Sequence, residues 1–451
     1  MTFLLNTIID LFEGVNIMAT LNYQPSARVK GVPVSATLKV NEKIALMRNA
    51  GESVFHMGFG ESPFPVHSHI QDALKAASAS NQYPPTLGLP QLCELARNTL
   101  SKKLGFNGAN VDTLVAPGSK DLLFASQLAI AGDLLLPTPS WVSYAPQAQL
   151  AGTSAIKIPT QAKHHHALRG ALISQTVKSA RENGLNPTKI ILNYPNNPTG
   201  LGFSESELKE VANACRDNGL IVISDEIYGL VSHSLPHQSI AHYYPEGTIV
   251  TTGLSKHLSI GGYRVGFAFI PKSLTGLLGD MAAIASETWS CVSHPIQYAS
   301  IAALEGNQDV EDHIQLCTKA HGLVSNYVRD CILEMGIEYP PLVGAFYMYP
   351  DFSQFYSQLA NAYSVKTSTD LADNLLDHHS LATLPGVDFG DDPQVLTLRL
   401  AITDYDGKAA LNYLAEHPDV KSSVFANAVA PRVVQACAIL SDYISSARSQ
   451  S

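Results

Sequence analysis

Lys256 lies in a short run whose residue types could hold a cofactor that carries both an aldehyde and a phosphate. The run extends from Thr252 to Arg264 and reads TGLSKHLSIGGYR. A lysine amine can form a Schiff base with an aldehyde, and an arginine eight residues later can pair with phosphate through two parallel hydrogen bonds. Because a single lysine is more often a solvated surface charge, the hypothesis depends on finding the other parts of such a site.

Two further segments supply groups that such a cofactor needs. Asp225 follows the apolar run 220–224, and α/β sheets bind ligands at the carboxyl ends of their strands. Its carboxylate would face a ligand bound there, although an aspartate after a strand can also cap a helix. Residues 118–120 (GSK) precede a helical stretch at 121–130, whose first backbone N–H groups would attract a phosphate.

Arg399 is a charged residue inside an apolar strand. It stands between Leu398 and Leu400, where an unpaired guanidinium would be costly. A bound carboxylate is the natural partner. The alternative is an internal salt bridge to Asp404 or Asp406.

Short apolar runs alternate with helical segments between Ser62 and Ala303. Such alternation predicts a mostly parallel sheet that is buried on both faces. The runs are 113–115, 133–136, 189–192, 220–223, 248–251 and 265–270. A helix at 40–51 and a strand at 54–58 come before them. After Ala303 we expect a smaller α+β arrangement with a strand pair at 344–349 and 397–400, then a last helix from Pro431 that frays after residue 444.

The chain is long enough for two domains. We predict a large cofactor-binding α/β domain at 61–305 and a small domain built from 23–60 and 306–451. Residues 1–22 would be an N-terminal extension, and Met18 is a second possible start of translation. The apolar segment 2–12 lacks a basic beginning and contains Asp10, so we do not expect an export signal.

Composition excludes several kinds of partner. With 29 basic and 39 acidic residues the net charge is −10, and no basic run interleaves with aromatic residues, so nucleic acid is not expected. No stretch approaches the roughly 20 apolar residues that span a bilayer. Six cysteines without C-x-x-C spacing suit reduced thiols in the cytoplasm. The histidine run 164–166 has no carboxylate or cysteine partners nearby, so we expect an exposed loop and no metal.

Seven motifs in a fixed order resemble one enzyme family. They are 83–90 (YPPTLGLP), 117–120 (PGSK), 139–141 (PSW), 194–200 (YPNNPTG), 224–228 (SDEIY), 256–264 and Arg399. The set is similar to the class I/II aminotransferases, within the fold-type I pyridoxal-phosphate enzymes of the aspartate aminotransferase superfamily. The resemblance implies pyridoxal 5'-phosphate as the cofactor, with Lys256 as its Schiff-base residue and Asp225 as the partner of its pyridine nitrogen.

The resemblance also implies roles for residues whose local sequence alone is uninformative. Asn197 and Tyr228 would bond the phenolic oxygen of the cofactor, and Trp141 would stack on its ring. The phosphate would be bound by Gly118, Ser119, Lys120, Ser255 and Arg264. Tyr83 would reach the phosphate from the neighbouring subunit, which implies a homodimer with shared sites.

The substrates implied by the resemblance are an amino acid and a 2-oxo acid. Arg399 would bind the substrate α-carboxylate, with Gly60 contributing a backbone contact from the opposite side. Three departures from the family pattern stand out: Ser62 where many relatives have proline, Gly253 where some have a phosphate-binding serine, and no arginine in 287–295 for a second carboxylate. Aspartate and glutamate are therefore not secure as the amino donor.

The predicted activity is amino-group transfer by a ping-pong mechanism. Lys256 would both anchor the cofactor and move the Cα proton of the substrate. Two alternatives stay open: a lyase that eliminates a β- or γ-substituent, such as a C–S lyase or an aminocyclopropane-carboxylate synthase, and a non-catalytic regulatory module that binds the cofactor. The short, non-basic N-terminus leaves little room for the DNA-binding extension that such a module would need.

Overall fold

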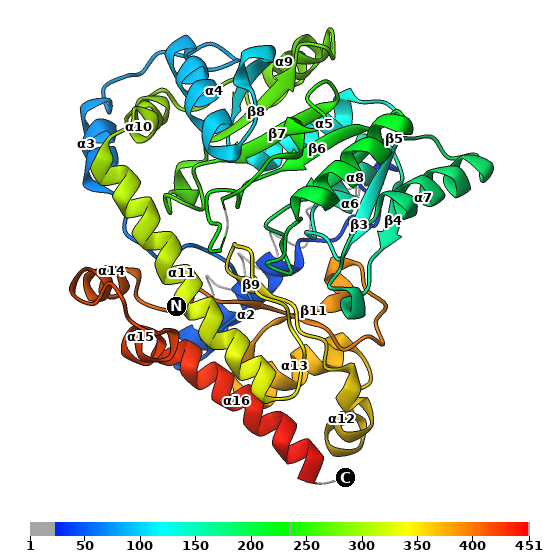
Figure 1. The fold of residues 1–451 in the computed structure, drawn as a ribbon, viewed down its shortest axis with the longest axis vertical. Coiled ribbons are helices and arrows are strands. Elements are labelled where there is room, and N and C mark those ends of the chain that lie inside the picture. The colour runs from blue at the N-terminus through cyan, green and yellow to red at the C-terminus, as the bar shows by residue number, and fades with distance from the viewer. Residues whose placement is uncertain (1–22, 235, 450–451) are drawn as a thin grey trace, which may run out of the picture.

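The computed structural model describes residues 23–234 and 236–449, so the extension predicted at 1–22 lies outside the described residues. Figure 1 shows a central sheet with flanking helices at one end of the molecule and the C-terminal elements at the other. The long helix α11 (Gln308–Glu334) runs between these two parts.

The central sheet has seven strands in the order β2-β8-β7-β6-β5-β3-β4. β8 is antiparallel to both of its neighbours, and all other pairs are parallel. The strands are β2 (Val111–Ala116), β3 (Asp133–Thr138), β4 (Ala155–Pro159), β5 (Pro187–Asn193), β6 (Ile221–Asp225), β7 (Thr248–Gly253) and β8 (Gly266–Pro271). The predicted mostly parallel sheet is therefore confirmed.

Strand β4 is the one strand of this sheet that the apolar runs did not indicate. It reads AIKIP, so Lys157 interrupts its apolar pattern. β4 pairs only with β3 at the edge of the sheet, and four of its five residues keep some contact with solvent. An edge strand has less surface to bury and therefore leaves a weaker signal in the sequence.

Helices cover both faces of this sheet, as alternate residues of its strands require. In β6, Ile223 packs on the face covered by α5 (Ser119–Ala129) and α9 (Leu277–Thr288). Its neighbour Val222 packs on the opposite face, below α7 (Gly170–Glu182) and α8 (Glu205–Asp217). The other helices of this part are α3 (Ser68–Ala76), α4 (Pro90–Leu104), α6 (Tyr144–Ala151) and α10 (His294–Leu304).

Two small sheets lie outside residues 61–305. β12 is antiparallel to both β9 and β11, and Leu400 faces Met348, which confirms the predicted strand pair. β1 is parallel to β10. The strands are β1 (Phe55–His56), β9 (Tyr347–Met348), β10 (Leu381–Ala382), β11 (Leu384–Pro385) and β12 (Leu398–Ala401). The helices around them are α12 (Tyr356–Tyr363), α13 (Ser368–His379), α14 (Gly407–Glu416), α15 (Ser422–Val429) and α16 (Pro431–Ser449).

The expected fraying after residue 444 is wrong, because α16 continues to Ser449. Arg448 donates a hydrogen bond to the backbone oxygen of Met335 at 3.0 Å, and its guanidinium lies 4.5 Å from the centroid of the Phe355 ring. These contacts hold the last turn against its neighbours.

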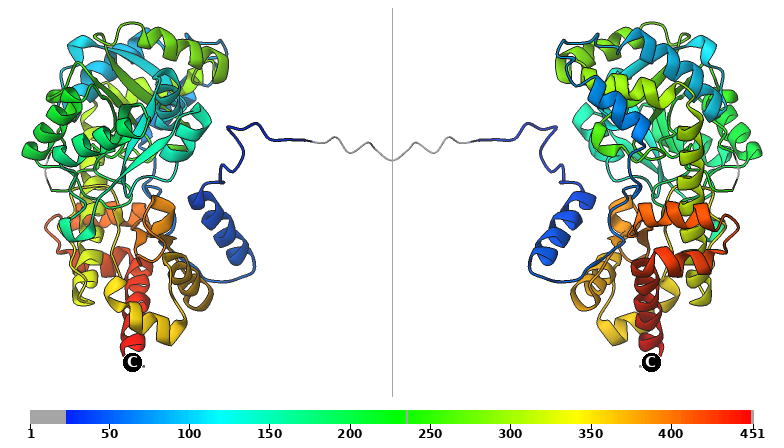
Figure 2. Two further views of the ribbon diagram at one scale, coloured as in Figure 1. Left: turned by 90° about the vertical axis from the view of Figure 1, so that its right-hand side faces the viewer. Right: turned by 90° about the vertical axis from the view of Figure 1, so that its left-hand side faces the viewer.

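Helix α2 (Ala36–Asn49) lies at one side of the molecule, and the described chain before it leads away from the body (Figure 2). Leu46 on this helix is 70% exposed. Within residues 23–234 and 236–449, no single helix is long and apolar enough to cross a membrane. One pair, α15 with α16, meets the criterion jointly by length and composition, with a bend of 108° between the two helices.

Candidate active site

The candidate site lies where neighbouring parallel strands end. Asn193 at the end of β5 is paired in register with Asp225 at the end of β6. β7 ends at Gly253, so the following residues bring Lys256 to the same edge of the sheet. Carboxyl ends of parallel strands are where α/β sheets bind ligands.

A cavity of about 180 Å³ opens at this edge. Most of the residues predicted for the site line it: Gly60, Ser119, Lys120, Trp141, Asn197, Asp225, Tyr228, Lys256 and Arg399. The other lining residues are Ser35, Thr37, Leu38, Phe59, Tyr144, Asn193, Ile227 and Tyr347. Four predicted residues are not part of its lining: Gly118, Ser255, Arg264 and Tyr83.

The amine of Lys256 is held loosely beside the cavity. Its Nζ donates a hydrogen bond to the backbone oxygen of Gly60 at 3.3 Å. The same atom lies 5.6 Å from the centroid of the Tyr228 ring and 5.7 Å from that of Phe346. No carboxylate of the described residues forms an ion pair with it, so the amine is available to react with an aldehyde.

Asp225 is a buried carboxylate whose side chain is short of positive partners. It is 3% exposed, and one oxygen accepts a hydrogen bond from the Tyr144 hydroxyl at 2.7 Å. Burial raises the pKa of Asp225 to about 6. A cation beside this carboxylate would offset the cost of burial. Because the chain continues from Asp225 into turns and not into a helix, the helix-capping alternative does not apply.

Asn193 is a site residue that the sequence reasoning missed. Its side-chain amide donates to the backbone oxygen of Asp225 at 2.8 Å, and its side-chain oxygen accepts from the backbone N–H of Asn197 at 2.8 Å. Asn193 thus joins the two segments whose roles were predicted separately. The available signal was its position as the last polar residue of a buried strand.

The N-terminus of α5 forms an anion cradle beside the cavity. Gly118 precedes the helix with a φ of +96°, and no side chain caps the first turn. A side chain at Gly118 would collide with the guanidinium of Arg264. That guanidinium donates to the backbone oxygens of Pro117 and Gly261, at 3.0 Å each. Uncapped N–H groups and an adjacent arginine are what a phosphate requires.

Lys120 and Trp141 lie together on one wall of the cavity. The Lys120 Nζ is 5.0 Å from the centroid of the Trp141 ring, and burial lowers the pKa of this lysine. The Trp141 ring meets the Tyr144 ring edge to face, with 5.3 Å between centroids. The lysine amine is therefore directed toward the indole, and not only toward the end of α5.

Arg399 is fully buried at 1% exposure and is packed between two aromatic rings. Its guanidinium carbon lies 4.8 Å from the Tyr347 centroid and 5.2 Å from the Phe389 centroid. One nitrogen donates to the backbone oxygen of Gly58 at 2.5 Å and another to the side chain of Asn197 at 3.3 Å. Its Nε has no hydrogen-bond partner among the described residues.

The two carboxylates considered as internal partners of Arg399 are engaged elsewhere. Asp404 forms an ion pair with Arg432 at 3.0 Å. Asp406 caps α14, where it accepts from the backbone N–H groups of Lys408 and Ala409. Burial lowers the pKa of Arg399, as expected for a cation without a charge partner.

These features fit an anionic cofactor with an aldehyde and a cationic ring. Lys256 offers a free amine, Asp225 a buried carboxylate, the start of α5 an uncapped anion cradle, and Arg399 an unpaired Nε. The hydroxyl of Thr37, on the cavity wall, is also without a partner among the described residues. The residues present would satisfy such a cofactor together with a substrate carboxylate.

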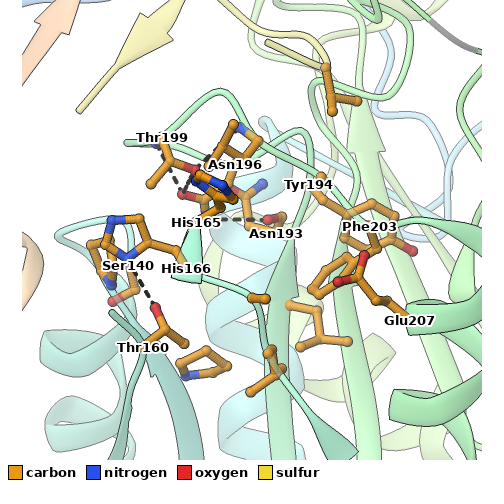
Figure 3. A pocket seen from close by; sticks show the side chains of 18 of the residues that line it. Ser140, Thr160, His165, His166, Asn193, Tyr194, Asn196, Thr199, Phe203 and Glu207 are labelled. Carbon is orange, nitrogen blue, oxygen red and sulfur yellow. Dashed lines mark hydrogen bonds between the residues drawn. The ribbon is translucent and has the colours of Figure 1, made fainter. Parts of the chain in front are cut away.

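Figure 3 shows a second cavity, with a volume of about 300 Å³. Tyr144 and Asn193 line both this cavity and the first one. The second cavity contains the histidine run 164–166, for which we expected an exposed loop. The first two histidines are exposed, but His166 is partly buried and shares a hydrogen bond with Thr160 at 3.1 Å. Burial lowers the pKa of His166 to about 4, so this ring is neutral at physiological pH.

Tyr83 lies on the surface of this chain with 92% of its area exposed. Its predicted role requires a neighbouring subunit.

Replacing Arg399 with lysine tests the carboxylate assignment. Lysine keeps the charge but loses the planar fork, so we expect the KM for the amino acid to rise about 10²-fold. Steady-state kinetics measure the effect. The matched control is Arg432→Gln, which breaks the pair with Asp404 and should lower thermal stability without changing KM. An unchanged KM in Arg399→Lys would contradict the assignment.

Comparison with known proteins gives the family. The model described as "Aminotransferase class I and II" matches residues 52–412. The aspartate aminotransferase of Geobacillus stearothermophilus is 30% identical over 373 residues, which are 80% of this chain and 91% of that protein. The probable N-acetyl-LL-diaminopimelate aminotransferase of Bacillus subtilis is 31% identical over 346 residues, covering 75% of this chain and 82% of that protein.

Solved structures agree with this result. The aromatic aminotransferase of Pyrococcus horikoshii is 26% identical, with a TM-score of 0.70, over 84% of this chain and 100% of that one. The aspartate aminotransferase of Thermus thermophilus, solved with maleate, has a TM-score of 0.76 over 87% of this chain and 99% of that one. At 24% identity it supports the fold alone.

The fold and the motifs define a pyridoxal-phosphate-type aminotransferase scaffold. The chain belongs to the class I and II aminotransferase family, whose members are enzymes that typically use pyridoxal phosphate.

Proposed function

We propose that this protein transfers an amino group from an L-amino acid to a 2-oxo acid, with pyridoxal 5'-phosphate as its cofactor and a ping-pong order of events. The observation that carries the proposal is the convergence of Lys256, Asp225 and Arg399 on one cavity. These residues supply an amine, a buried carboxylate and an unpaired guanidinium nitrogen within the volume of one small ligand.

Each of these groups would have a distinct task. Bound pyridoxal phosphate supplies an electron-withdrawing ring that stabilises negative charge on the substrate Cα. Asp225 would hold a proton on the ring nitrogen, since a buried carboxylate favours a cation beside it. Arg399 would bind the substrate carboxylate through its Nε and an Nη. Lys256 Nζ would remove the Cα proton and return a proton in the later step.

The surroundings of these residues support the same assignment. Tyr144 and Asn193 hold Asp225 from its side chain and its backbone, at 2.7 and 2.8 Å respectively. The hydroxyl of Tyr228 lies 3.0 Å from that of Tyr347, and burial raises the pKa of Tyr228. Tyr228 is therefore protonated at neutral pH and can donate to the phenolic oxygen of the cofactor.

The decisive experiment follows the cofactor spectrum of the purified, loaded protein while single L-amino acids are added without an oxo acid. Aminotransfer predicts conversion to the aminated form of the cofactor with one equivalent of 2-oxo acid released. Continuous release of ammonia, with the original spectrum restored, would instead identify a lyase. Absence of both reactions with every amino acid would sink the proposal.

The donor panel should begin with L-aspartate and L-glutamate. Arg399 lines the cavity and would bind the α-carboxylate that these two donors share with other amino acids. Two of the relatives are called aspartate aminotransferase and asparagine–oxo-acid transaminase. No arginine for a second carboxylate is present in 287–295, so donors with a single carboxylate belong in the same panel.

We also propose that the protein is a homodimer in which Tyr83 of each subunit completes the phosphate site of the other. With 92% of its area exposed, the Tyr83 side chain is free to contact a second subunit. Tyr83→Ala should lower the affinity for pyridoxal phosphate about tenfold or more, the usual effect of losing a hydrogen bond to a charged group. Gel filtration and titration of the cofactor-free protein measure the two claims.

Mixed dimers distinguish a shared site from a local effect of Tyr83. A dimer of one Tyr83→Ala subunit and one Lys256→Ala subunit would contain one site with both residues intact. Such dimers should bind cofactor at that site with normal affinity. If they show only the weakened affinity of Tyr83→Ala, or if the protein elutes as a monomer, then Tyr83 does not act across an interface.

A further inference from the structure

Four buried or half-buried residues form one continuous hydrogen-bonded chain next to the Lys256 segment. The hydroxyls of Ser259 and Ser62 are 2.6 Å apart. The Ser62 hydroxyl is also 3.3 Å from Nε2 of His321, whose Nδ1 is 2.9 Å from the Tyr405 hydroxyl. Ser62, His321 and Tyr405 are 7%, 2% and 9% exposed, so water does not compete for these bonds. We refer to Ser259, Ser62, His321 and Tyr405 as the Ser62 chain.

The Ser62 chain joins three separate parts of the protein. Ser259 follows Lys256 by three residues and adopts a φ of +57°, a left-handed conformation that serine avoids unless its surroundings hold it there. Ser62 follows Gly60, whose backbone oxygen accepts the hydrogen bond of the Lys256 amine. His321 lies on α11, which connects the central sheet to the C-terminal elements.

The chain also borders the amine of Lys256 through an aromatic ring. The His321 ring lies 4.9 Å from the Phe346 ring, centroid to centroid. The Lys256 Nζ is 5.7 Å from the Phe346 centroid. Phe64 contacts His321 edge-on at 4.9 Å and leaves it little freedom. The backbone segment of Lys256 is therefore held through Ser259, which contacts Ser62. The amine of Lys256 lies beside the Phe346 ring, which contacts His321.

A neutral His321 makes these bonds directional. Burial lowers the pKa of His321 well below its ordinary value, and the nearby Lys256 amine acts in the same direction. A neutral imidazole has one N–H donor and one acceptor. If the Tyr405 hydroxyl donates to Nδ1, then Nε2–H donates to Ser62, and Ser62 donates to Ser259. Each hydroxyl then has a defined partner, which makes the arrangement rigid.

We propose that the Ser62 hydroxyl is a positioning residue for Lys256: its bonds to Ser259 and His321 hold the lysine segment so that the amine faces the cofactor and the substrate Cα. The part of this inference that concerns the cofactor and the substrate Cα rests on the proposed function. The part that concerns the bonds of Ser62 does not. Ser62 occupies the position where many members of the resembling family have proline, a residue without a side-chain donor. This chain therefore locates its lysine segment with a polar contact that proline could not provide.

The test compares Ser62→Ala, Ser259→Ala and the double variant with the wild-type protein. The first readout is the rate at which the cofactor-free protein forms its covalent bond with added pyridoxal phosphate. Visible absorbance monitors this reaction. The second is the rate of the single-turnover reaction with an amino acid and its Cα-deuterated form. We expect both rates to fall about tenfold or more because of misplacement of the amine, with an unchanged Kd for the amino acid and a larger isotope effect.

The double variant shows whether the effects of the two substitutions come from the same hydrogen bond. If the contact between Ser62 and Ser259 carries it, then the double variant should be no slower than either single variant. The matched control is Ser325→Ala, because Ser325 is fully buried on the same helix as His321 and its hydroxyl has no partner among the described residues. This control should keep both wild-type rates.

The outcomes are separable. Wild-type rates and isotope effect in Ser62→Ala would overturn the inference, and so would an equal slowing in Ser325→Ala. If Ser62→Ala does not fold, Ser259→Ala breaks the same bond from the other side and decides the question. If the wild-type protein turns over no amino acid, the proposed function fails, while the rate of cofactor attachment still tests the positioning of Lys256.

Discussion

Replacing Lys256 with alanine is expected to lower turnover by about 10⁴-fold or more, because the same amine would anchor the cofactor and move the substrate proton. Among the described residues, Lys256 and Lys120 are the two lysines that line the cavity. The amine of Lys120 lies against the Trp141 ring. Steady-state activity measures the loss. Some cofactor should stay bound, since Asp225 and the start of α5 are intact, and this is measured by absorbance after gel filtration.

The variant Lys256→Arg separates chemistry from charge. Arginine keeps a positive charge near Gly60 and the two aromatic rings, but it stays protonated in proteins and cannot accept the Cα proton. We therefore expect Lys256→Arg to be as inactive as Lys256→Ala. Activity within tenfold of wild type in either variant would disprove the assignment.

Replacing Asp225 with asparagine is the change with the second largest expected effect. Asparagine has nearly the same shape and can still accept the hydrogen bond from Tyr144, but it lacks the charge that would hold a proton on the cofactor ring. We expect turnover to fall about 10³-fold, a loss typical of removing one preorganised electrostatic group from a buried site. Single-turnover kinetics should place the loss in proton removal and not in amino acid binding.

The same substitution, Asp225→Asn, should lower turnover but raise the free energy of unfolding of the cofactor-free protein. Burial raises the Asp225 pKa from 3.8 to about 6 in the folded state. The folded protein thus binds this proton more tightly than the unfolded chain. The cost of the buried charge is absent below about pH 4 and complete above about pH 6. Two pKa units correspond to about 3 kcal/mol.

Cofactor-free Asp225→Asn should therefore be more stable than cofactor-free wild type at pH 7, and the difference should disappear as the pH falls to about 4. Urea unfolding at several pH values measures it. A gain in stability together with a loss of activity identifies a residue selected for function. If the variant is instead less stable at pH 7, the carboxylate serves the fold itself.

Much of the central sheet could be predicted, because fully buried parallel strands are nearly continuous apolar runs bounded by turn residues. Strand β6 is a clear case: apolar residues lead to Asp225 at its end. Strand β4 was not predicted, because Lys157 faces solvent at the sheet edge and interrupts the apolar pattern. The last turn of α16 was also not predicted, because the contact between Arg448 and Met335 joins residues that are far apart in the sequence and leaves no local signal.

The residues of the candidate site also fall into two groups: those that the sequence indicates and those that it does not. Lys256, Asp225 and Arg399 are conspicuous in the sequence, because an amine, a carboxylate or a guanidinium beside apolar residues is costly without a partner. Asn193 and Tyr347 are not conspicuous. An asparagine at the end of a strand and a tyrosine in an aromatic run are common, and their roles depend on residues far away along the chain.

The amino-acid sequence is enough to indicate the chemistry: it shows which groups can react and which strands end beside them, because both follow from residue type and local pattern. Their arrangement depends on how the whole chain packs. It includes the pairing of Asn193 with Asp225, the isolation of Arg399 from Asp404, and the bonds of Ser62 to Ser259 and His321. Such contacts join residues up to hundreds of positions apart, and the packing of the whole chain selects them among many combinations that local patterns permit equally well.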